Sequence, residues 1–205
     1  MTTVHIVDDD DAIRSALSLL LRSAGHEPAA FDSPETYLRT VPHDADACLL
    51  LDIQMPGLNG LDLMEKLAGR APLPPVIVLT GHGDIPMAVA AMKRGALDFL
   101  EKPFSDSALL ALIERASVLL DQRRNQRKAF DRYEQALALL TAREREIMDR
   151  VIKGQANKVI ALELDISERT VEIHRGRVMK KIGVRSVAEL VQYALQRGAI
   201  RSIAD

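Results

Sequence analysis

Five polar residues in the first half of the sequence share one placement, because each stands at the end of a short run that is expected to form a strand. They are Asp8, Asp9, Asp52, Thr80 and Lys102. The runs are four or five residues long, which is typical of strands buried on both faces of a parallel sheet. They cover Val4–Val7, Ala47–Leu51, Val76–Leu79 and Leu97–Glu101. Because parallel strands end at the edge of the sheet where open α/β folds bind ligands, we expect the five side chains to meet in one crevice.

The three carboxylates of this set predict a metal site. Close carboxylates repel one another, and a hard divalent cation that prefers oxygen ligands relieves the repulsion. We expect Mg²⁺ (or Mn²⁺) to be bound directly by Asp9 and Asp52, and by Asp8 directly or through water. The backbone carbonyl of Gln54 can supply a further oxygen ligand.

The same set predicts phosphoryl transfer to Asp52. Such transfer depends mainly on positioning and charge neutralisation. Asp52 is then the nucleophile that becomes a 4-aspartylphosphate, while the Thr80 hydroxyl and the Lys102 ammonium each contact a phosphoryl oxygen. We expect no enzyme activity beyond this Mg-dependent self-phosphorylation and autodephosphorylation. By their spacing from the site residues, Gln54 and His82 are the side chains expected to control the rate of dephosphorylation.

Amphipathic segments separate the apolar runs, so the first half predicts an α/β domain. These segments cover Ala12–Ala24, Pro34–Thr40, Gly60–Ala68 and Ile85–Arg94. Alternating strands and helices are joined by right-handed crossovers, which place helices over both faces of a parallel sheet. Asp10 and Asp11 are expected to cap the first helix, and Ser33 followed by Pro34 the second.

Residues 105–140 contain neither proline nor glycine and are rich in residues that favour helix. We expect one long helix, or two nearly continuous ones, with the polar run Asp121–Lys128 in solvent. The chain then divides into an α/β domain (1–118), a helical linker (119–136) and a C-terminal domain (137–205).

The C-terminal domain is predicted to be all helical and to contain a helix-turn-helix. The stretches Thr141-Ala-Arg-Glu144 and Ser186-Val-Ala-Glu189 are capping boxes that each open a helix. Between them lie a short helix at Asn157–Leu164, a tight turn, and a longer helix at Glu168–Ile182 with Ser167 as its cap. In a helix-turn-helix the second helix enters the major groove of DNA.

The helix at Glu168–Ile182 has a buried stripe and an opposite face suited to DNA. Val171, Val178 and Ile182 form the stripe. On the opposite face Ile173 is a large apolar residue, and Gly176 costs about 1 kcal/mol relative to alanine in a helix interior. Both are explained if this face lies against DNA bases. The expected DNA contacts are Lys158, Arg169, Thr170, Glu172, Ile173, Arg177 and Lys180.

The charge distribution favours a polyanionic partner for the C-terminal half, although an ordinary solvated surface also fits the charge alone. Residues 1–118 hold 17 acidic and 9 basic side chains, a formal charge of −8, whereas residues 119–205 hold 12 and 18, a formal charge of +6. Aromatic residues make up only 3%, which argues against stacking on single-stranded nucleic acid. No apolar run is long enough for a membrane span and no signal peptide pattern is present, so we expect a cytoplasmic protein with no membrane partner.

Residues 1–118 resemble the receiver domain of two-component response regulators. The matching stretches are His5–Asp9, Leu51–Gly57, Val78–Asp84 and Asp98–Phe104. The resemblance implies a (βα)5 flavodoxin-like fold with a five-stranded parallel sheet, a cognate histidine kinase as phosphodonor, and a cis peptide before Pro103. It also implies a switch in which Thr80 moves toward the phosphate and Phe99 reorients.

Residues 137–200 resemble the LuxR-type output domain of the NarL/FixJ class. The matching stretches are Leu140–Glu146, Asn157–Ala161, Ile166–Arg175 and Val178–Ile182. The resemblance implies a four-helix domain that binds double-stranded promoter DNA, acts with RNA polymerase to activate transcription, and forms its dimer contact on DNA through the helix at Ser186–Gln196. Within the class the sequence resembles regulators of nitrogen-fixation or microaerobic genes, whose kinase is the haem-bearing oxygen sensor FixL. Regulators with other inputs share these motifs, so another pathway stays open.

Phosphorylation is expected to free the DNA-binding domain from the receiver and to favour a homodimer. The segments Ile85–Arg94 and Asp98–Glu101 mix apolar and charged side chains that can pair across a two-fold axis. The dimerisation candidates are Met87, Val89, Lys93 and Asp98.

Three other functions fit parts of the sequence less well. A phosphohydrolase with an aspartate nucleophile usually has a second acid two residues later, where this chain has Gln54. A quorum-sensing regulator needs an aromatic-lined ligand pocket, and the first half of the chain holds few aromatic residues. A DNA-binding protein with an inactive receiver is disfavoured by the complete set of acids.

Overall fold

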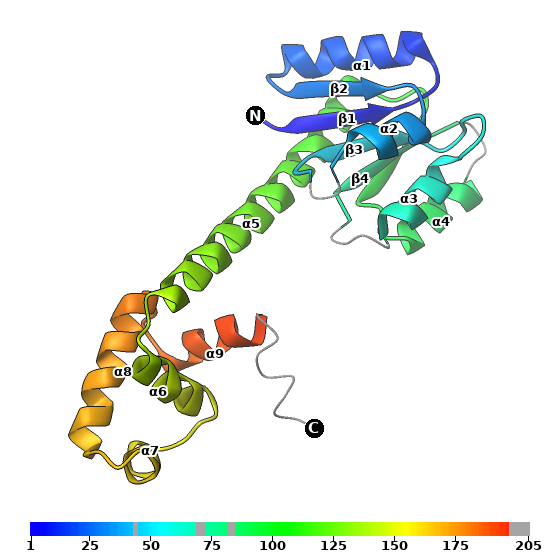
Figure 1. The fold of residues 1–205 in the computed structure, drawn as a ribbon. Coiled ribbons are helices and arrows are strands. Elements are labelled where there is room, and N and C mark those ends of the chain that lie inside the picture. The colour runs from blue at the N-terminus through cyan, green and yellow to red at the C-terminus, as the bar shows by residue number, and fades with distance from the viewer. Residues whose placement is uncertain (43–44, 69–72, 82–84, 197–205) are drawn as a thin grey trace. The chain divides into compact units, whose positions relative to one another are not determined.

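The computed structural model describes residues 1–42, 45–68, 73–81 and 85–196 (Figure 1). The chain forms two compact units, Met1–Arg124 and Asn125–Asp205. Within the described ranges, no helix combines the length and the apolar character needed to cross a membrane.

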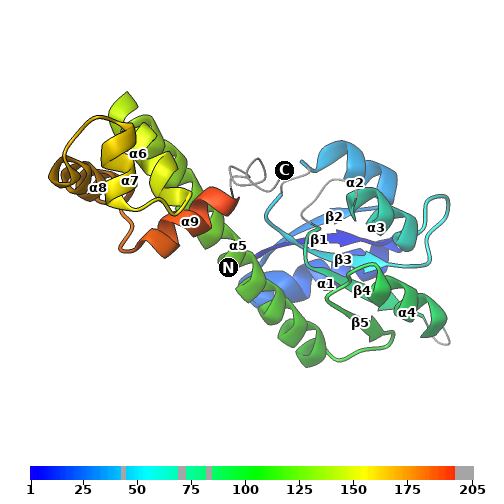
Figure 2. The ribbon, with the colours of Figure 1, turned by 90° about the horizontal axis from the view of Figure 1, so that it is seen from below.

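The first unit is built on a parallel sheet with the strand order β2-β1-β3-β4-β5 (Figure 2). Its strands are β1 (Thr3–Val7), β2 (Glu27–Phe31), β3 (Cys48–Asp52), β4 (Val76–Thr80) and β5 (Asp98–Glu101). The order reverses between β1 and β3, and open sheets of this kind bind their ligands beyond the carboxyl ends of the strands at that point. The predicted parallel five-stranded fold is confirmed.

Helices cover both faces of this sheet, because successive strand residues point to opposite sides. On one face Ile6 and Leu50 pack against α1 (Asp11–Ser23) and the first part of α5 (Asp106–Ala138). On the other face Val7 and Leu51 pack with residues of the remaining helices. These are α2 (Pro34–Thr40), α3 (Gly60–Ala68) and α4 (Ile85–Lys93). As expected, Asp10 caps α1 by accepting from the Ala12 and Ile13 amides, and Ser33 caps α2.

One helix, α5, belongs to both units, which confirms the prediction of a long uninterrupted helix. Its Leu109, Ile113, Ala116 and Leu120 lie in the core of the first unit, and its Tyr133 and Leu137 lie in the core of the second. The run Asp121–Lys128 is exposed, as predicted. The range proposed for the linker, 119–136, thus includes side chains that are buried in either core.

Two arginines near the end of the first unit bond α5 to loops of that unit. The Arg123 guanidinium donates to the Leu73 carbonyl at 2.7 Å, and Arg124 pairs with the Asp46 carboxylate at 2.7 Å. The first unit therefore reaches along α5 beyond its last core residue, Leu120.

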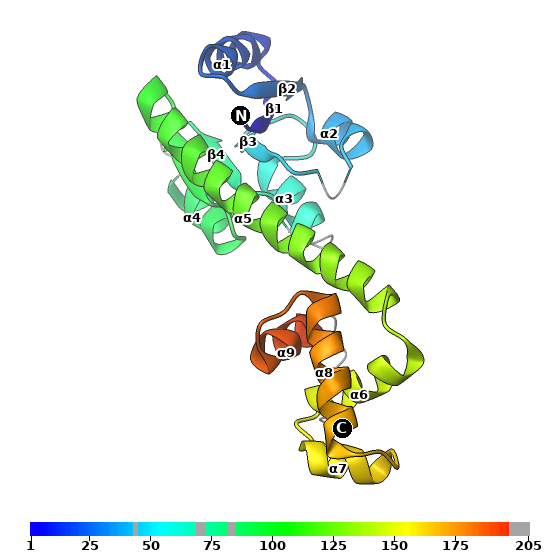
Figure 3. The same cartoon turned by 90° about the vertical axis from the view of Figure 1, so that its left-hand side faces the viewer.

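The second unit packs α6 (Ala142–Ile152), α7 (Asn157–Glu163), α8 (Glu168–Ile182) and α9 (Val187–Gln196) around a hydrophobic core (Figure 3). Thr141 and Glu144 form the predicted capping box, and Ser167 caps α8. At α9 the predicted box is only half formed. Ser186 accepts from the Glu189 amide at 3.1 Å, but the Glu189 carboxylate accepts from the Arg185 amide at 2.9 Å, one residue earlier than expected.

Candidate functional site

The carboxyl ends of β1 and β3 bring three acids together. Asp8 has no exposed surface and Asp52 has 7%, whereas Asp9 is exposed. Carboxylate oxygens of the three residues lie within 4.8 Å of one another. The structure thus brings the predicted acids together, with Thr80 buried at the end of β4.

Lys102, which directly follows β5, reaches both buried acids. Its Nζ lies 2.9 Å from Asp8 Oδ2 and 3.4 Å from Asp52 Oδ2. Burial raises the pKa of the Asp52 carboxyl, Lys102 opposes this shift, and the Asp8 carboxylate adds to it. The ammonium therefore offsets part of the cost of burying two carboxylates side by side.

The donor set suits a hard divalent cation, because it consists of carboxylate oxygens that lie close together. Both oxygens of Asp8 already accept hydrogen bonds, Oδ1 from the Asp10 amide at 2.9 Å and Oδ2 from Lys102. The Asp52 carboxylate also has partners, Lys102 and the Gln54 amide. Asp9, whose side chain takes part in none of the hydrogen bonds and ion pairs identified among the described residues, is therefore the best candidate for a direct ligand, and Asp8 would bind directly or through water. The Gln54 backbone lies at the site, since its amide bonds to the Asp52 carboxylate.

The candidate switch residues occupy neighbouring strands. The Thr80 hydroxyl donates to the Leu100 carbonyl of β5 at 3.4 Å, and Phe99 of the same strand is exposed. The peptide between Lys102 and Pro103 is cis, as the receiver resemblance implied. Thr80 therefore bonds to the strand that carries Phe99.

Gly60, at the start of α3, is a site residue that the sequence analysis missed. A Cβ at this position would lie 2.4 Å from the Asp52 carbonyl oxygen, and the Gly60 amide donates to the Ile53 carbonyl at 3.1 Å. The backbone of α3 therefore packs directly against the backbone that carries Asp52. Its only sequence signal was a glycine at the predicted helix start.

The four dimerisation candidates differ in their exposure and in the contacts that they already make. Val89 is 48% exposed and Lys93 is exposed, while Met87 packs partly against the core. The Asp98 carboxylate is paired with Arg115 of α5 at 2.7 Å. His82, named above for dephosphorylation, lies outside the described residues.

The predicted DNA-contacting residues lie on the surface of the second unit. All are exposed except Thr170, which is half-buried and shares a 2.8 Å hydrogen bond with the Ser167 hydroxyl. Ile173 is 48% exposed, and a Cβ added to Gly176 would meet no atom within 4 Å. Nothing in the fold requires glycine there, which agrees with a role in close approach to DNA. The exposed set is Lys158, Arg169, Glu172, Ile173, Arg177 and Lys180.

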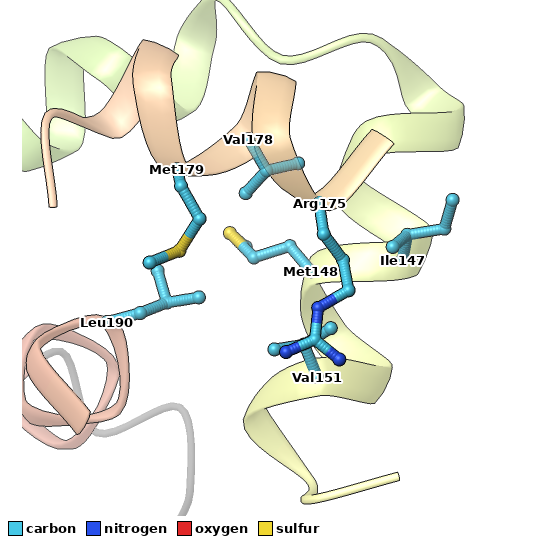
Figure 4. Close-up of a pocket in the computed structure, with 7 residues that line it drawn as sticks. All are labelled: Ile147, Met148, Val151, Arg175, Val178, Met179 and Leu190. Carbon is cyan, nitrogen blue, oxygen red and sulfur yellow. The ribbon is translucent and has the colours of Figure 1, made fainter. Parts of the chain in front are cut away.

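Arg175 is a second residue whose role the sequence analysis missed. It extends from α8 toward Met148 and Val151 of α6 (Figure 4). Its guanidinium donates to Asn157 Oδ1 at 2.5 Å. Asn157 opens α7 and precedes Lys158, so Arg175 ties together the two helices of the helix-turn-helix.

The far end of α8 is anchored by a buried acid. Lys181 donates to the Glu144 carboxylate at 2.6 Å and to the Leu139 carbonyl at 3.2 Å. The hydrogen bond from Lys181, followed by that from the Thr141 amide, lowers the pKa of Glu144 to about 2. Contacts at the middle of α8, through Arg175, and at its C-terminal end, through Lys181, thus fix its orientation within its unit.

Comparisons with known proteins match both units. Residues 4–114 match the response regulator receiver domain, and residues 138–194 match the bacterial regulatory proteins of the luxR family. The chain is 40% identical over 203 residues to the transcriptional regulatory protein FixJ of Bradyrhizobium diazoefficiens, covering 98% of this chain and 99% of FixJ. It is 44% identical to the response regulator protein TmoT of Ectopseudomonas mendocina, over 93% of this chain and 87% of TmoT. The solved structure of the response regulator StyR has a TM-score of 0.77 at 45% identity, over 95% and 98% of the two chains.

Proposed function

This chain belongs to the response regulators that join a receiver domain to a LuxR-type DNA-binding domain, and we propose that phosphorylation of Asp52 switches it into a dimer that activates transcription. Membership of the family implies a histidine kinase and DNA as partners. The observation that carries the proposal is the buried Asp52 carboxylate, which lies beside Lys102 and the acids at the end of β1.

The chemical step is transfer of a phosphoryl group from a phosphohistidine of the kinase. An Asp52 carboxylate oxygen forms the new bond to phosphorus while the bond between phosphorus and the imidazole nitrogen breaks, and the imidazole leaves with that electron pair. A bound Mg²⁺ or Mn²⁺ would neutralise charge on the phosphoryl oxygens. Asp9 and Asp52, the Gln54 carbonyl, and Asp8 directly or through water would hold the ion, while Lys102 pairs with a phosphoryl oxygen.

Thr80 responds to phosphorylation of Asp52 by changing its hydrogen-bond acceptor. Its hydroxyl now donates to the Leu100 carbonyl, and a phosphoryl oxygen on Asp52 is a stronger, charged acceptor. Movement of Thr80 toward the phosphate releases its bond to β5 and leaves room for Phe99 to turn inward. Phe99 lacks a hydroxyl, so it signals by packing alone.

The switch is proposed to expose a dimer face at α4 and β5 and to free the DNA-binding unit. Met87, Val89, Lys93 and Asp98 contribute to that face. In the dimer the two α8 helices bind the two halves of a palindromic operator. The two α9 helices form the contact between the DNA-bound chains, and the dimer then recruits RNA polymerase.

The pathway has two candidates. Similarity to FixJ over nearly the whole chain supports control of nitrogen-fixation or microaerobic genes by a FixL-like haem kinase. Comparable identity to TmoT supports a regulator of the same mechanism in another pathway. Promoter binding across the genome separates the two, since only the first candidate occupies nitrogen-fixation or microaerobic promoters.

The mechanism is tested with acetyl phosphate and Mg²⁺. The wild-type chain should gain an adduct that hydroxylamine removes, together with higher affinity for its operator. Asp52→Asn should lose both, whereas Asp106→Asn, which alters an exposed acid at the start of α5, should behave as wild type. An adduct that persists in Asp52→Asn, or a phosphorylated wild type with unchanged DNA affinity, contradicts the proposal.

A further inference from the structure

Arg14, in the first part of α1, bonds to the backbone of the acid pair. Its Nη1 donates to the Asp8 carbonyl at 2.8 Å and its Nη2 to Asp11 Oδ1 at 2.9 Å. The Arg14 side chain is only 16% exposed, so its position is constrained by packing as well as by the two bonds.

The bond to the Asp8 carbonyl acts on a particular peptide. This carbonyl belongs to the planar peptide unit that joins Asp8 to Asp9. On either side the chain is already held, since the Asp8 amide donates to the Phe31 carbonyl at 3.3 Å and the Asp10 amide to Asp8 Oδ1 at 2.9 Å. The bond from Arg14 adds a third restraint, because it fixes the plane of the peptide that joins Asp8 to Asp9.

We propose that Arg14 is a positioning residue for the divalent cation site, which it serves by orienting the Asp8–Asp9 peptide and so the exposed Asp9 carboxylate. This inference rests on the proposed role of the three acids as the metal site. Asp8 is held by four partners, but none of the hydrogen bonds and ion pairs identified among the described residues involves the side chain of Asp9. The direction of its carboxylate therefore depends on its backbone.

Electrostatics alone predicts the opposite effect of removing Arg14. A guanidinium close to the acids repels a divalent cation, so loss of its charge would tighten metal binding. Loss of the bond to the Asp8 carbonyl would loosen the peptide and weaken binding. The sign of the change in affinity thus distinguishes a positioning role from a purely electrostatic one.

The test measures metal binding directly on the unphosphorylated full-length chain. Mn²⁺ binding is followed by the electron paramagnetic resonance of free Mn²⁺, and Mg²⁺ binding by calorimetry. Arg14→Met and Arg14→Gln should each weaken binding about tenfold, as is usual when a residue that orients a metal ligand is removed. Asp11→Asn removes the ion pair of Arg14 with Asp11 while keeping an acceptor oxygen there, and it should stay close to wild type. Arg22→Met removes a charge from the end of the same helix and controls for net charge.

A kinetic readout separates positioning from general damage. In phosphorylation by acetyl phosphate, the two Arg14 variants should need about tenfold more Mg²⁺ for half-maximal rate, while the rate at saturating Mg²⁺ stays near that of wild type. Circular dichroism of each variant checks folding. Because two different neutral substitutions are used, the test still works if one of the variants does not fold.

Each outcome has a distinct meaning. If wild type binds neither metal, the proposed metal site fails, whatever Arg14 does. If wild type binds and a folded Arg14 variant binds equally or more tightly, the positioning role is overturned while the site stands. Weaker binding in Asp11→Asn of the same size as in Arg14→Met would also overturn it, because the ion pair rather than the Asp8 carbonyl would then be responsible.

Discussion

The Asp52 carboxylate has to be ionised to act as a nucleophile, and its burial works against ionisation. Burial and the neighbouring Asp8 both raise its pKa, while Lys102 lowers it. Because Lys102 pairs with both Asp8 and Asp52, its single ammonium compensates part of the negative charge of both acids before any metal binds. The ionisation of Asp52 thus depends on residues from two other strand ends, Asp8 after β1 and Lys102 after β5.

At Gly60 a single methyl group should disturb this arrangement. The Cβ of Gly60→Ala would lie 2.4 Å from the Asp52 carbonyl and 3.0 Å from the Ile53 Cα, and backbone atoms cannot yield as a flexible side chain can. We expect a loss of roughly 1–3 kcal/mol in the stability of the first unit, as for other overpacked sites. Phosphorylation by acetyl phosphate should also slow, and chemical denaturation measures the first effect.

Gly176→Ala is the matched control, since the same methyl group meets no atom there. It should stabilise the second unit by about 1 kcal/mol through helix propensity. If Gly60→Ala proves as harmless as Gly176→Ala, the close packing of α3 against Asp52 is not rigid.

The ion pair of Glu144 with Lys181 should appear as a pH-dependent stability of the second unit. The pKa of Glu144 falls from 4.5 to about 2 in the folded state, so the ionised carboxylate stabilises that state. The contribution is complete above the ordinary value of 4.5 and is lost as the pH falls from there toward 2. Glu144→Gln should therefore destabilise the unit near neutral pH and lose this effect in acid.

Calorimetry of the full-length chain at several pH values measures the difference between Glu144→Gln and wild type. Asp149→Asn, an exposed acid on the same helix, is the comparison. A difference between Glu144→Gln and wild type that stays constant from neutral pH down to about pH 2 would mean that the carboxylate of Glu144 does not titrate as its contacts imply.

At the scale of elements, the sequence predicted the strands that end in site residues and missed β2, which does not. β1, β3 and β4 are mostly apolar and buried along almost their whole length, and such strands are distinctive because both of their faces are buried. β2, Glu27-Pro-Ala-Ala-Phe31, lies at the edge of the sheet, where a proline and exposed residues are tolerated. Its sequence has no long apolar run, so no pattern marked it as a strand.

Helix ends were also predictable, because caps are local. Thr141, Ser167 and Asp10 act within three residues of their own position. The contacts of Arg14, Arg175 and Gly60 were not predictable in the same way. They depend on which carbonyl or amide the folded chain brings near, and a single arginine or glycine in a sequence does not specify its partner.

The end of α5 makes a testable contribution to the second unit. Tyr133 is buried, and its ring stacks on Tyr193 of α9 with centroids 5.0 Å apart. Tyr133 lies before residue 138, where the match to the luxR family begins. Tyr133→Ala should cost about 3–5 kcal/mol, as for other buried aromatic residues. Thermal unfolding of the full-length chain measures it, and the exposed Gln135→Ala on the same turn should change little.

At the scale of the whole molecule, the proposed switch depends on self-association through α4 and β5. Val89 is exposed on α4, and Asp98 must leave Arg115 before it can pair with a second chain. Val89→Asp places a charge where the interface buries an apolar side chain, so dimerisation should weaken by at least about tenfold. Phosphorylation of Asp52 should be unaffected, because Val89 is not one of the residues that surround Asp52.

Sedimentation at micromolar protein, with and without beryllofluoride as a stable phosphate mimic, measures this change. The control is Leu19→Asp, which places the same charge at an even more exposed apolar residue on α1. A wild-type chain that remains a monomer in both conditions, or a Val89→Asp variant that still dimerises, rules out this dimer face.

The shared helix α5 also determines where natural or engineered recombination can exchange one sensory half for another. Along α5, Leu120 is the last residue found in the core of the first unit and Tyr133 the first found in the core of the second, among the residues that the structure describes. A crossover between these residues leaves both cores complete, as long as the new sequence remains helical. A chimaeric protein joined after Tyr133 would inherit an output half without its own aromatic stack. New inputs are therefore best grafted within residues 125–132.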